Sequence, residues 1–205
     1  MMAAVTRLLI LINLAVFALQ ALYGDALLVT FALWPVGRHF LPELQATVSF
    51  QPWQLLTSAF LHANVTHVAL NMFGLYMFGR DVERTLGAGR FLSLYLAAVL
   101  SAALVQLAVT SINFSGTPYP TVGASGGVFG ILLAFAVLYP RRTVILLIPP
   151  IPMPAWLFVV LYGLVELVSG IFGTSQGIAH FAHLGGMVGA YFMLRHWRRS
   201  NDVAQ

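Results

Sequence analysis

The sequence contains no cysteine and no lysine, and only 8% of its 205 residues are charged. Without cysteine, disulfides, thiolate catalysis and cysteine-bound metal are excluded. So little charge cannot cover the surface of a water-soluble domain of this length, and 60% of the residues are hydrophobic. We therefore expect one domain over residues 1–205, an all-α membrane protein built as a bundle of roughly five to seven spans with short loops.

Long uncharged stretches predict six transmembrane helices. The two longest stretches exceed one crossing, and each is divided where Gly, Pro or small polar residues gather, at 113–120 and 169–176. The stretch broken by Pro52 places its span in about its last eighteen residues. The predicted spans are about 8–24, 62–79, 91–112, 123–140, 155–170 and 179–195.

The arginines predict how these spans are oriented. With six spans, nine of the ten arginines lie on one side and only Arg38 lies on the other, which puts both termini in the cytoplasm under the positive-inside rule. The arginines form small groups at the ends of apolar runs, with no basic face carrying interleaved aromatics, so we expect no nucleic acid partner. A signal peptide is the alternative for the first span, because Arg7 precedes an apolar run that ends in small residues.

About forty residues separate the first two spans, and they hold several bulky aromatics. Such residues favour the membrane interface, so we expect a large first loop that rests in the outer interface as a re-entrant or amphipathic structure. The sequence shows no internal repeat and no low-complexity tract. The aromatics are Trp34, Phe40, Phe50 and Trp53.

Strongly polar side chains within predicted spans are costly in lipid and are candidates for function. Three predicted spans, the second, fourth and sixth, begin at the outer face and carry such groups near it. Ser125 begins the fourth span, and His183 lies about one turn into the sixth, roughly 6 Å deep. His67 and Asn71 are four residues apart in the second, so they share a helical face. The groups should therefore lie at similar depth. The full set is His62, His67, Asn71, Ser125, Glu166, His180 and His183.

Ser125 stands at a loop-to-helix junction among glycines. A lone serine in a span usually bonds back to a carbonyl, but a helix N-terminus offers free N–H groups and a positive dipole end that suit an oxyanion. Gly126 and Gly130 form a small-residue face that lets another helix approach closely. The sixth span has similar faces, and packing the two spans together would bring Ser125 near His183. Those faces are Gly185 with Gly189, and Gly186 with Ala190.

The remaining polar groups each leave alternatives open. His67 and Asn71 are either an interhelical hydrogen-bond pair or donors to a developing oxyanion, and His62 near the interface suits either role. No HExxH motif is present and no acid sits beside the histidines, so we expect no metal and no cofactor. Glu166 is interpreted as a hydrogen-bonded structural acid, and no carboxylate is expected to orient His183, so Ser–His catalysis here would use a dyad.

Several of these segments together resemble the rhomboid family of intramembrane proteases over most of the chain. Residues 123–126 resemble the GxSG nucleophile motif, and the spacing of His62, His67 and Asn71 matches the second-span HxxxxHxxxN motif. Residues 182–186 resemble the sixth-span motif that carries the catalytic histidine. Weaker matches are Trp53 with Thr57 at the end of the first loop, and Glu83, Arg84, Leu86 and Gly87 after the second span.

The resemblance implies a compact six-span prokaryotic form with a serine endopeptidase activity. Ser125 would attack the scissile carbonyl and His183 would be the general base. His67, Asn71 and the Ser125 N–H would hold the oxyanion, and Phe129 would pack against the histidine. The substrate would be a transmembrane helix of another membrane protein, cut near the outer face of the inner membrane after a small residue. The sequence gives no oligomeric state.

Three departures from the family bear on loop anchoring and rate. The family often has Trp-Arg in the first loop, whereas Trp53 is followed here by Gln54, and tyrosine is common where Phe129 stands. The family's late small-residue repeat also ends here in Ala190 instead of glycine. We further expect the first loop or the end of the fifth span to gate lateral access, with Trp156, Phe158 and Phe172 as candidates.

Three other classes remain as alternatives. A catalytically silent rhomboid-like chaperone or adaptor usually lacks the serine or the histidine, and this chain has both. A secondary transporter is expected to show broken helices, midplane charges and repeats, for which Glu166 alone is thin support. A metal-dependent membrane hydrolase would be identified by metal analysis.

Overall fold

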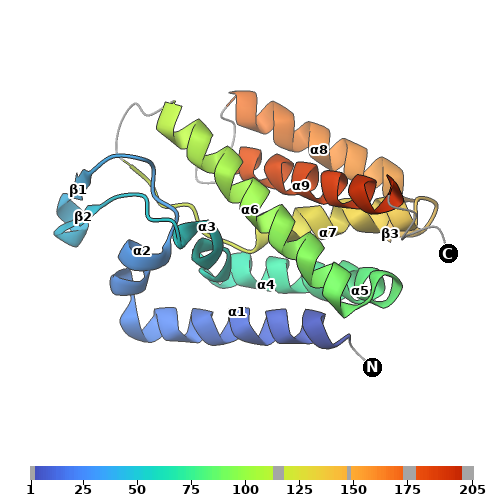
Figure 1. The fold of residues 1–205 in the computed structure, drawn as a ribbon, viewed down its shortest axis with the longest axis horizontal. Coiled ribbons are helices and arrows are strands. Elements are labelled where there is room, and N and C mark those ends of the chain that lie inside the picture. The colour runs from blue at the N-terminus through green and yellow to red at the C-terminus, as the bar shows by residue number, and fades with distance from the viewer. Residues whose placement is uncertain (1–2, 113–117, 147–148, 173–178, 200–205) are drawn as a thin grey trace.

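The computed structural model describes residues 3–112, 118–146, 149–172 and 179–199, which are mostly helical (Figure 1). The expected all-α membrane class is therefore confirmed. Long helices run along the longest axis of the molecule, and α1 begins and α9 ends at the end opposite the β1–β2 hairpin (Figure 1). The helices are α1 (Ala4–Tyr23), α2 (Asp25–Phe31), α3 (Gln54–Thr57), α4 (Val65–Gly74), α5 (Arg80–Leu86), α6 (Ala88–Ile112), α7 (Ser125–Leu138), α8 (Ala155–Phe172) and α9 (His180–Arg199).

The shorter elements complete the described chain. Strand β1 (His39–Leu41) pairs antiparallel with β2 (Ala46–Val48), and β3 (Thr143–Ile145) pairs antiparallel with β4 (Pro152–Pro154). Two 3₁₀ helices, η1 (Pro42–Leu44) and η2 (Ser58–Phe60), lie in the first loop, and a π-helix, η3 (Leu75–Gly79), joins α4 to α5.

Each predicted span coincides with helical structure. Within the described residues, α1, α6 and α8 are long and apolar enough to cross a membrane, and α7 is a shorter apolar helix of 14 residues. The predicted span 62–79 corresponds to the continuous run α4–η3–α5, which begins at Val65 and extends to Leu86. The predicted breaks at 113–120 and 169–176 fall partly on residues 113–117 and 173–178, which lie outside the described residues.

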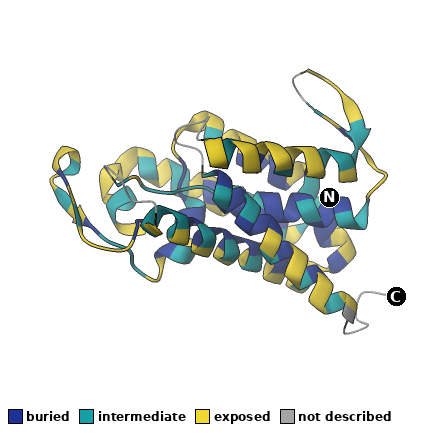
Figure 2. Cartoon of the chain, turned by 90° about the horizontal axis from the view of Figure 1, so that it is seen from above, coloured by how far each residue is buried: buried dark blue, intermediate teal, exposed yellow. Residues whose placement is uncertain are grey.

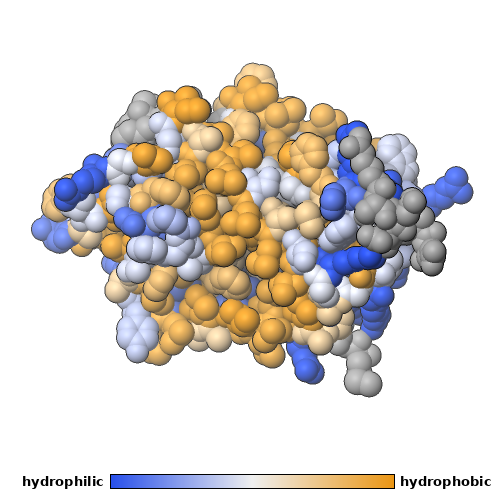
Figure 3. Space-filling model, in the orientation of Figure 1, coloured by the Kyte–Doolittle hydropathy of each residue, from blue (hydrophilic) through white to orange (hydrophobic). Residues whose placement is uncertain are grey.

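The apolar side chains are distributed as a lipid-embedded bundle requires. Buried positions gather in the middle of the molecule, chiefly on α6 and α7 (Figure 2). By contrast, α8 buries only Ala155, Val159 and Glu166, and exposes large apolar side chains such as Leu164 and Val168. On the face shown in Figure 3, hydrophobic residues cover the middle and hydrophilic ones lie mostly at the two ends. Apolar residues that point outward over this width are expected in contact with lipid.

The first loop is a folded structure with a small core of its own. The β1–β2 hairpin reverses direction at Gln45, a non-glycine residue with a φ of 47°. Leu41 and Val48 of this hairpin pack with Trp34 and Leu61, and all four are at most 2% exposed. The hairpin projects beyond the helices at one end of the molecule (Figure 1).

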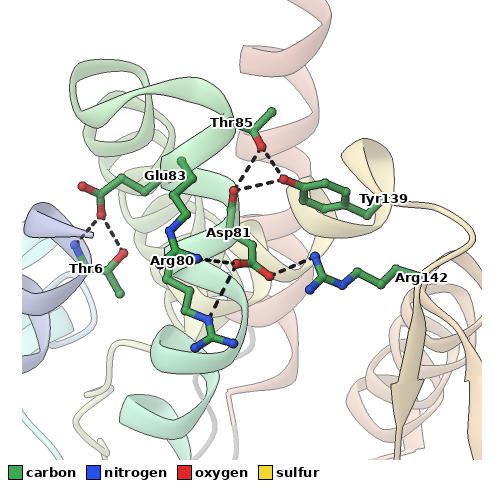
Figure 4. A network of polar contacts seen from close by, with 8 residues as sticks. Thr6, Arg80, Asp81, Glu83, Thr85, Tyr139 and Arg142 are labelled. Atoms are coloured by element: carbon green, nitrogen blue, oxygen red, sulfur yellow. Dashed lines mark hydrogen bonds and ion pairs between the residues drawn. The ribbon is translucent and has the colours of Figure 1, made fainter. Parts of the chain in front are cut away.

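A network of polar contacts ties the other end together (Figure 4). Both Glu83 carboxylate oxygens accept backbone N–H bonds from the first turn of α1, from Val5 at 2.9 Å and Thr6 at 2.7 Å, and the Thr6 hydroxyl donates a third bond. A carboxylate there satisfies helix-terminal donors and complements the positive end of the helix. Asp81 forms ion pairs with Arg80 and Arg84 of its own helix, α5, and with Arg142, which lies just before β3 and so ties α5 to the start of that strand.

The substitution Glu83→Gln is expected to lower the thermal unfolding temperature of the purified protein. The neutral amide offers one acceptor oxygen where the carboxylate offers two, so charge-assisted hydrogen bonds to buried donors are lost, at a cost of about 2 kcal/mol. Glu43→Gln, which makes the same change on the exposed turn η1, is the matched control and should leave the unfolding temperature unchanged. Equal unfolding temperatures for the two variants would contradict this role of Glu83.

Candidate active site

Ser125 is the first residue of α7 and follows a sharp turn at Gly123. Gly123 has a φ of 127°, and a Cβ at this position would lie 2.8 Å from the Nε2 of His67, so only glycine fits. The Gly123 N–H donates to the Ser58 carbonyl at 2.9 Å, which fixes the turn to the first loop. The first N–H groups of α7 have no helical carbonyl partner, so the serine stands at the positive end of a helix.

The Oγ of Ser125 and the Nε2 of His183 lie 2.8 Å apart, on α7 and α9. This is the hydrogen-bond distance that a nucleophile and its base require. The helices reach it because they cross very closely: a Cβ on Gly186 would overlap the Gly126 carbonyl, and one on Gly130 would lie 3.0 Å from the Gly186 carbonyl. The small-residue face Gly186–Ala190 therefore packs on α7.

The other small-residue face of α9 packs on a different helix. A Cβ on Gly185 would lie 2.9 Å from the Cβ of Val105, and one on Gly189 would lie 2.7 Å from the carbonyl of Ala97. Both neighbours belong to α6. Consequently α9 is held by close contacts on two sides, with His183 directed at Ser125 between them.

Phe129 lies one turn after Ser125 and stacks on the imidazole of His183. The ring centroids are 4.2 Å apart and the planes differ by 5°. Phe129 also contacts the ring of Tyr162 on α8, with the two ring centroids 5.0 Å apart. The phenyl ring thus fixes the plane of the imidazole even though the family's usual hydroxyl is absent.

His67 lies against the Gly123 turn and so beside Ser125. The Nδ1 of His67 accepts the Ala63 N–H at 3.4 Å, and in the neutral ring this leaves Nε2 as the protonated nitrogen. Asn71 uses one amide hydrogen to bond the His67 carbonyl at 2.9 Å, which leaves a second donor. Both residues therefore retain an N–H for a further hydrogen bond.

His62 packs against the ring of His67. Its buried ring meets the His67 ring edge to face, with the centroids 5.1 Å apart. Its backbone is clamped by the side chain of Gln20, which accepts from the His62 N–H at 2.9 Å and donates to the His62 carbonyl at 3.2 Å. The histidine thus joins α1 to the start of α4.

Glu166 corrects one expectation from the sequence. We expected no carboxylate near His183, but the Oε2 of Glu166 lies 2.9 Å from the His183 Nδ1, and 2.6 Å from the Nδ1 of His180. All three residues are at most 9% exposed. The signal available in the sequence was that Glu166 is the single acid in the last long apolar stretch, at a depth similar to that of His183. The spacing alone did not show which way it faces.

The donor atoms of Glu166, His180 and His183 all lie within 4.8 Å of one another, close enough to be considered for a metal. However, the ligands of a tetrahedral zinc ion, at bond lengths near 2.0–2.1 Å, lie about 3.3 Å apart. The separations of 2.6 and 2.9 Å are shorter and suit shared protons instead.

Gln54 takes the position where the family often has arginine, and it anchors the first loop. Its Oε1 accepts from the backbone N–H of Gln51 at 3.0 Å and of Trp34 at 3.3 Å, and its amide donates to the Thr30 and Ser49 carbonyls. The buried amide therefore satisfies four backbone groups of the first loop without a charge.

The first loop is also bonded directly to the segment that leads into the active site. Leu33 and Thr121 exchange two backbone hydrogen bonds, of 3.0 and 2.9 Å. Thr121 lies four residues before Ser125, so the loop helps to set the position of the serine.

A cavity of about 30 Å³ opens beside Ser125. Its wall is mostly small or apolar, with a few polar groups that include the amide of Gln106. A space of this size holds one water molecule or a small side chain. The residues that line it are Leu33, Ser58, Ala59, Val99, Ala102, Ala103, Gln106, Thr121, Val122, Gly123, Ser125, Gly126, Gly127, Ala179 and Ala182.

The candidate gate residues do not lie together. Trp156 and Phe158 are in the first turn of α8, next to the β3–β4 hairpin, whereas Phe172 is the last residue of the helix. Sixteen residues of α-helix separate Trp156 from Phe172, a distance of about 24 Å. Phe158 packs on Tyr162, the ring that contacts Phe129, whereas Phe172 is 73% exposed.

Comparison with known proteins identifies the family. The family model described as the Rhomboid domain matches residues 49–199. Rhomboid protein 1, mitochondrial, of Saccharomyces cerevisiae is 30% identical over 175 residues, which cover 79% of this chain and 48% of that protein. The rhomboid protease GluP of Bacillus subtilis is 34% identical, over 68% of this chain and 25% of that protein.

A third relative matches more of the chain. The rhomboid protease GlpG of Klebsiella pneumoniae is 29% identical over 87% of this chain and 57% of that protein. The chain thus spans between a quarter and little more than half the length of these curated relatives. Since the matched residues 49–199 contain the serine turn, the paired histidine and the second-span polar face, the chain belongs to the rhomboid family.

Proposed function

We propose that this integral membrane protein is an intramembrane serine protease that hydrolyses a peptide bond in or near a transmembrane helix of its substrate. The observation that carries this proposal is the 2.8 Å contact between Ser125 Oγ and His183 Nε2 at the N-terminus of an apolar helix. A partly buried Ser–His pair is uncommon among lipid-embedded side chains unless it has a function. Several of the relatives are named as proteases.

In the proposed reaction, the Ser125 oxygen attacks the scissile carbonyl while its proton passes to His183 Nε2. The carbonyl oxygen becomes an anion beside the Ser125 N–H, the His67 Nε2–H and the free amide hydrogen of Asn71. His183 then protonates the leaving amine, and an acyl-enzyme remains on Ser125. A water molecule, deprotonated by the same histidine, attacks the acyl group and releases the carboxylate product.

We propose six membrane crossings in the inner membrane with both termini in the cytoplasm. The one-sided arginines support this orientation, as does the location of the α1 start and the α9 end at the same end of the bundle. In this orientation the serine turn and the first loop lie at the outer face, where water can reach the acyl-enzyme.

Removal of either member of the pair is expected to abolish cleavage. A single-span reporter helix is co-reconstituted in lipid with wild type, Ser125→Ala or His183→Ala, and cleavage should fall at least about 10³-fold in both variants. Ser93→Ala on the exposed face of α6 and His39→Ala on β1 are the matched controls and should cleave like wild type.

Persistent cutting by the Ser125→Ala protein would show that another group is the nucleophile. If wild type fails against several unrelated helices while remaining folded, the protein is instead a catalytically silent rhomboid-like chaperone or adaptor.

Loss of the proposed oxyanion donors should lower kcat more than it raises KM. His67→Ala and Asn71→Ala each remove an N–H that bonds mainly to the charge formed in the transition state, so kcat is expected to fall about 10²–10³-fold. Steady-state kinetics on the reporter helix measures both constants. A rise in KM with kcat unchanged would assign these residues to substrate binding instead.

The cavity beside Ser125 should restrict the residue that precedes the cut. A reporter with alanine or serine there is expected to be cleaved, and one with phenylalanine should be cleaved at least about tenfold more slowly, because a ring cannot enter about 30 Å³. The measurement is kcat/KM for reporters that differ at this single position. Equal values for alanine and phenylalanine would mean that the cavity does not receive this side chain.

A further inference from the structure

Glu166 is not a residue that the packing of the apolar helix α8 would require. Helix α8 exposes most of its large apolar side chains, and Glu166 is one of just three residues that it buries. Its carboxylate faces α9, where it lies within 3 Å of the Nδ1 of both His180 and His183. A carboxylate kept in an apolar helix is costly, so the contact of Glu166 with two histidines of α9 calls for an explanation.

We propose that Glu166 positions His183 for catalysis, so that the pair of the proposed protease works as a triad on three helices. The order of atoms is Ser125 Oγ, then His183 Nε2 at 2.8 Å, then His183 Nδ1, then Glu166 Oε2 at 2.9 Å. This inference rests on the proposed function and assigns Glu166 a role that acts through His183.

Proton positions follow from what each atom can do. An ionised carboxylate only accepts hydrogen bonds, so the imidazole nitrogen that faces it carries the hydrogen. A neutral His183 with Nδ1–H has a bare Nε2, which is the form that can take the proton of Ser125. Glu166 thereby selects the competent tautomer, and it stabilises the imidazolium that forms when the serine attacks.

Phe129 and Glu166 restrict different motions of the His183 ring. Phe129 stacks within 5° of parallel and so fixes the plane of the imidazole. It cannot distinguish the two nitrogens or resist a flip within that plane, whereas an acceptor beside Nδ1 does both. Among the described residues, no other group offers the His183 Nδ1 a hydrogen bond.

His180 holds the carboxylate in place. Its Nδ1 bonds the same Oε2 at 2.6 Å, and its ring stands at 86° to that of His183. The contact of Oε2 with the His183 Nδ1 is short but bent away from a straight hydrogen bond. Catalytic hydrogen bonds often tighten only once substrate binds, so a small rotation of the Glu166 carboxylate is expected to align it.

The test compares Glu166→Gln with His180→Ala in the reconstituted full-length protein, using the reporter helix. Glu166→Gln should lower kcat at least about 100-fold with KM within about threefold of wild type, because the charge and the tautomer preference are lost. Glu166→Asp, which keeps the charge, should recover part of kcat. His180→Ala breaks the bond between α8 and α9 but leaves Glu166 beside His183, so its kcat should fall by at most about tenfold.

Two kinetic results would overturn the proposal. One is a kcat for Glu166→Gln within about threefold of wild type. The other is an equal loss in Glu166→Gln and His180→Ala, which would make Glu166 a structural link between the two helices. Wild type and Ser125→Ala are run alongside, so that failure of the proposed protease activity is recognised separately.

A measurement on the wild type decides the matter even where a variant does not fold or the reporter is not cut. Nitrogen-15 NMR of the histidine side chains in lipid distinguishes the two tautomers of His183, with its signal identified by its loss in His183→Gln. A hydrogen on Nδ1 with a bare Nε2 supports the positioning role. A hydrogen on Nε2 would overturn it.

Discussion

The crossing of α7 and α9 is the contact on which the site depends. At Gly126 and Gly186 the two backbones approach so closely that a single added carbon on Gly186 would overlap a carbonyl oxygen. This close approach of the two helices places Ser125 Oγ 2.8 Å from His183 Nε2. In lipid, helices gain little from burying apolar surface, so close van der Waals contact between small residues supplies much of the association.

A second constraint follows from the surrounding apolar medium, which leaves no water to satisfy polar groups inside the bundle. The structure meets it with short, specific pairings at both ends. At one end, Glu83 caps the first turn of α1, and at the other, Gln54 bonds backbone groups of the first loop. Leu33 and Thr121 then join that loop to the serine turn. The serine turn is thus tied to the loop that Gln54 anchors.

Much of this arrangement could be predicted from the sequence, because helices in lipid leave clear patterns. The uncharged stretches located the helices, and the depth argument grouped Ser125, His67 and His183 before any packing was known. The sequence does not predict which side of α8 faces the other helices. Nearly every residue of that helix is apolar, so no amphipathic stripe shows which side carries Glu166 inward, and the carboxylate beside His183 was missed. From the sequence, Gln54 in place of arginine suggested weaker anchoring of the first loop. The residue type alone does not reveal its four backbone partners.

The proposed chemistry requires Ser125 to be an activated nucleophile. The most direct test is to treat the wild-type protein in lipid with a fluorophosphonate, which reacts with serines that are activated by a base, and to map the adduct by mass spectrometry. We expect one modified residue, Ser125, and a rate of modification that falls sharply in His183→Ala. Modification of a different serine, or an unchanged rate without His183, would contradict it.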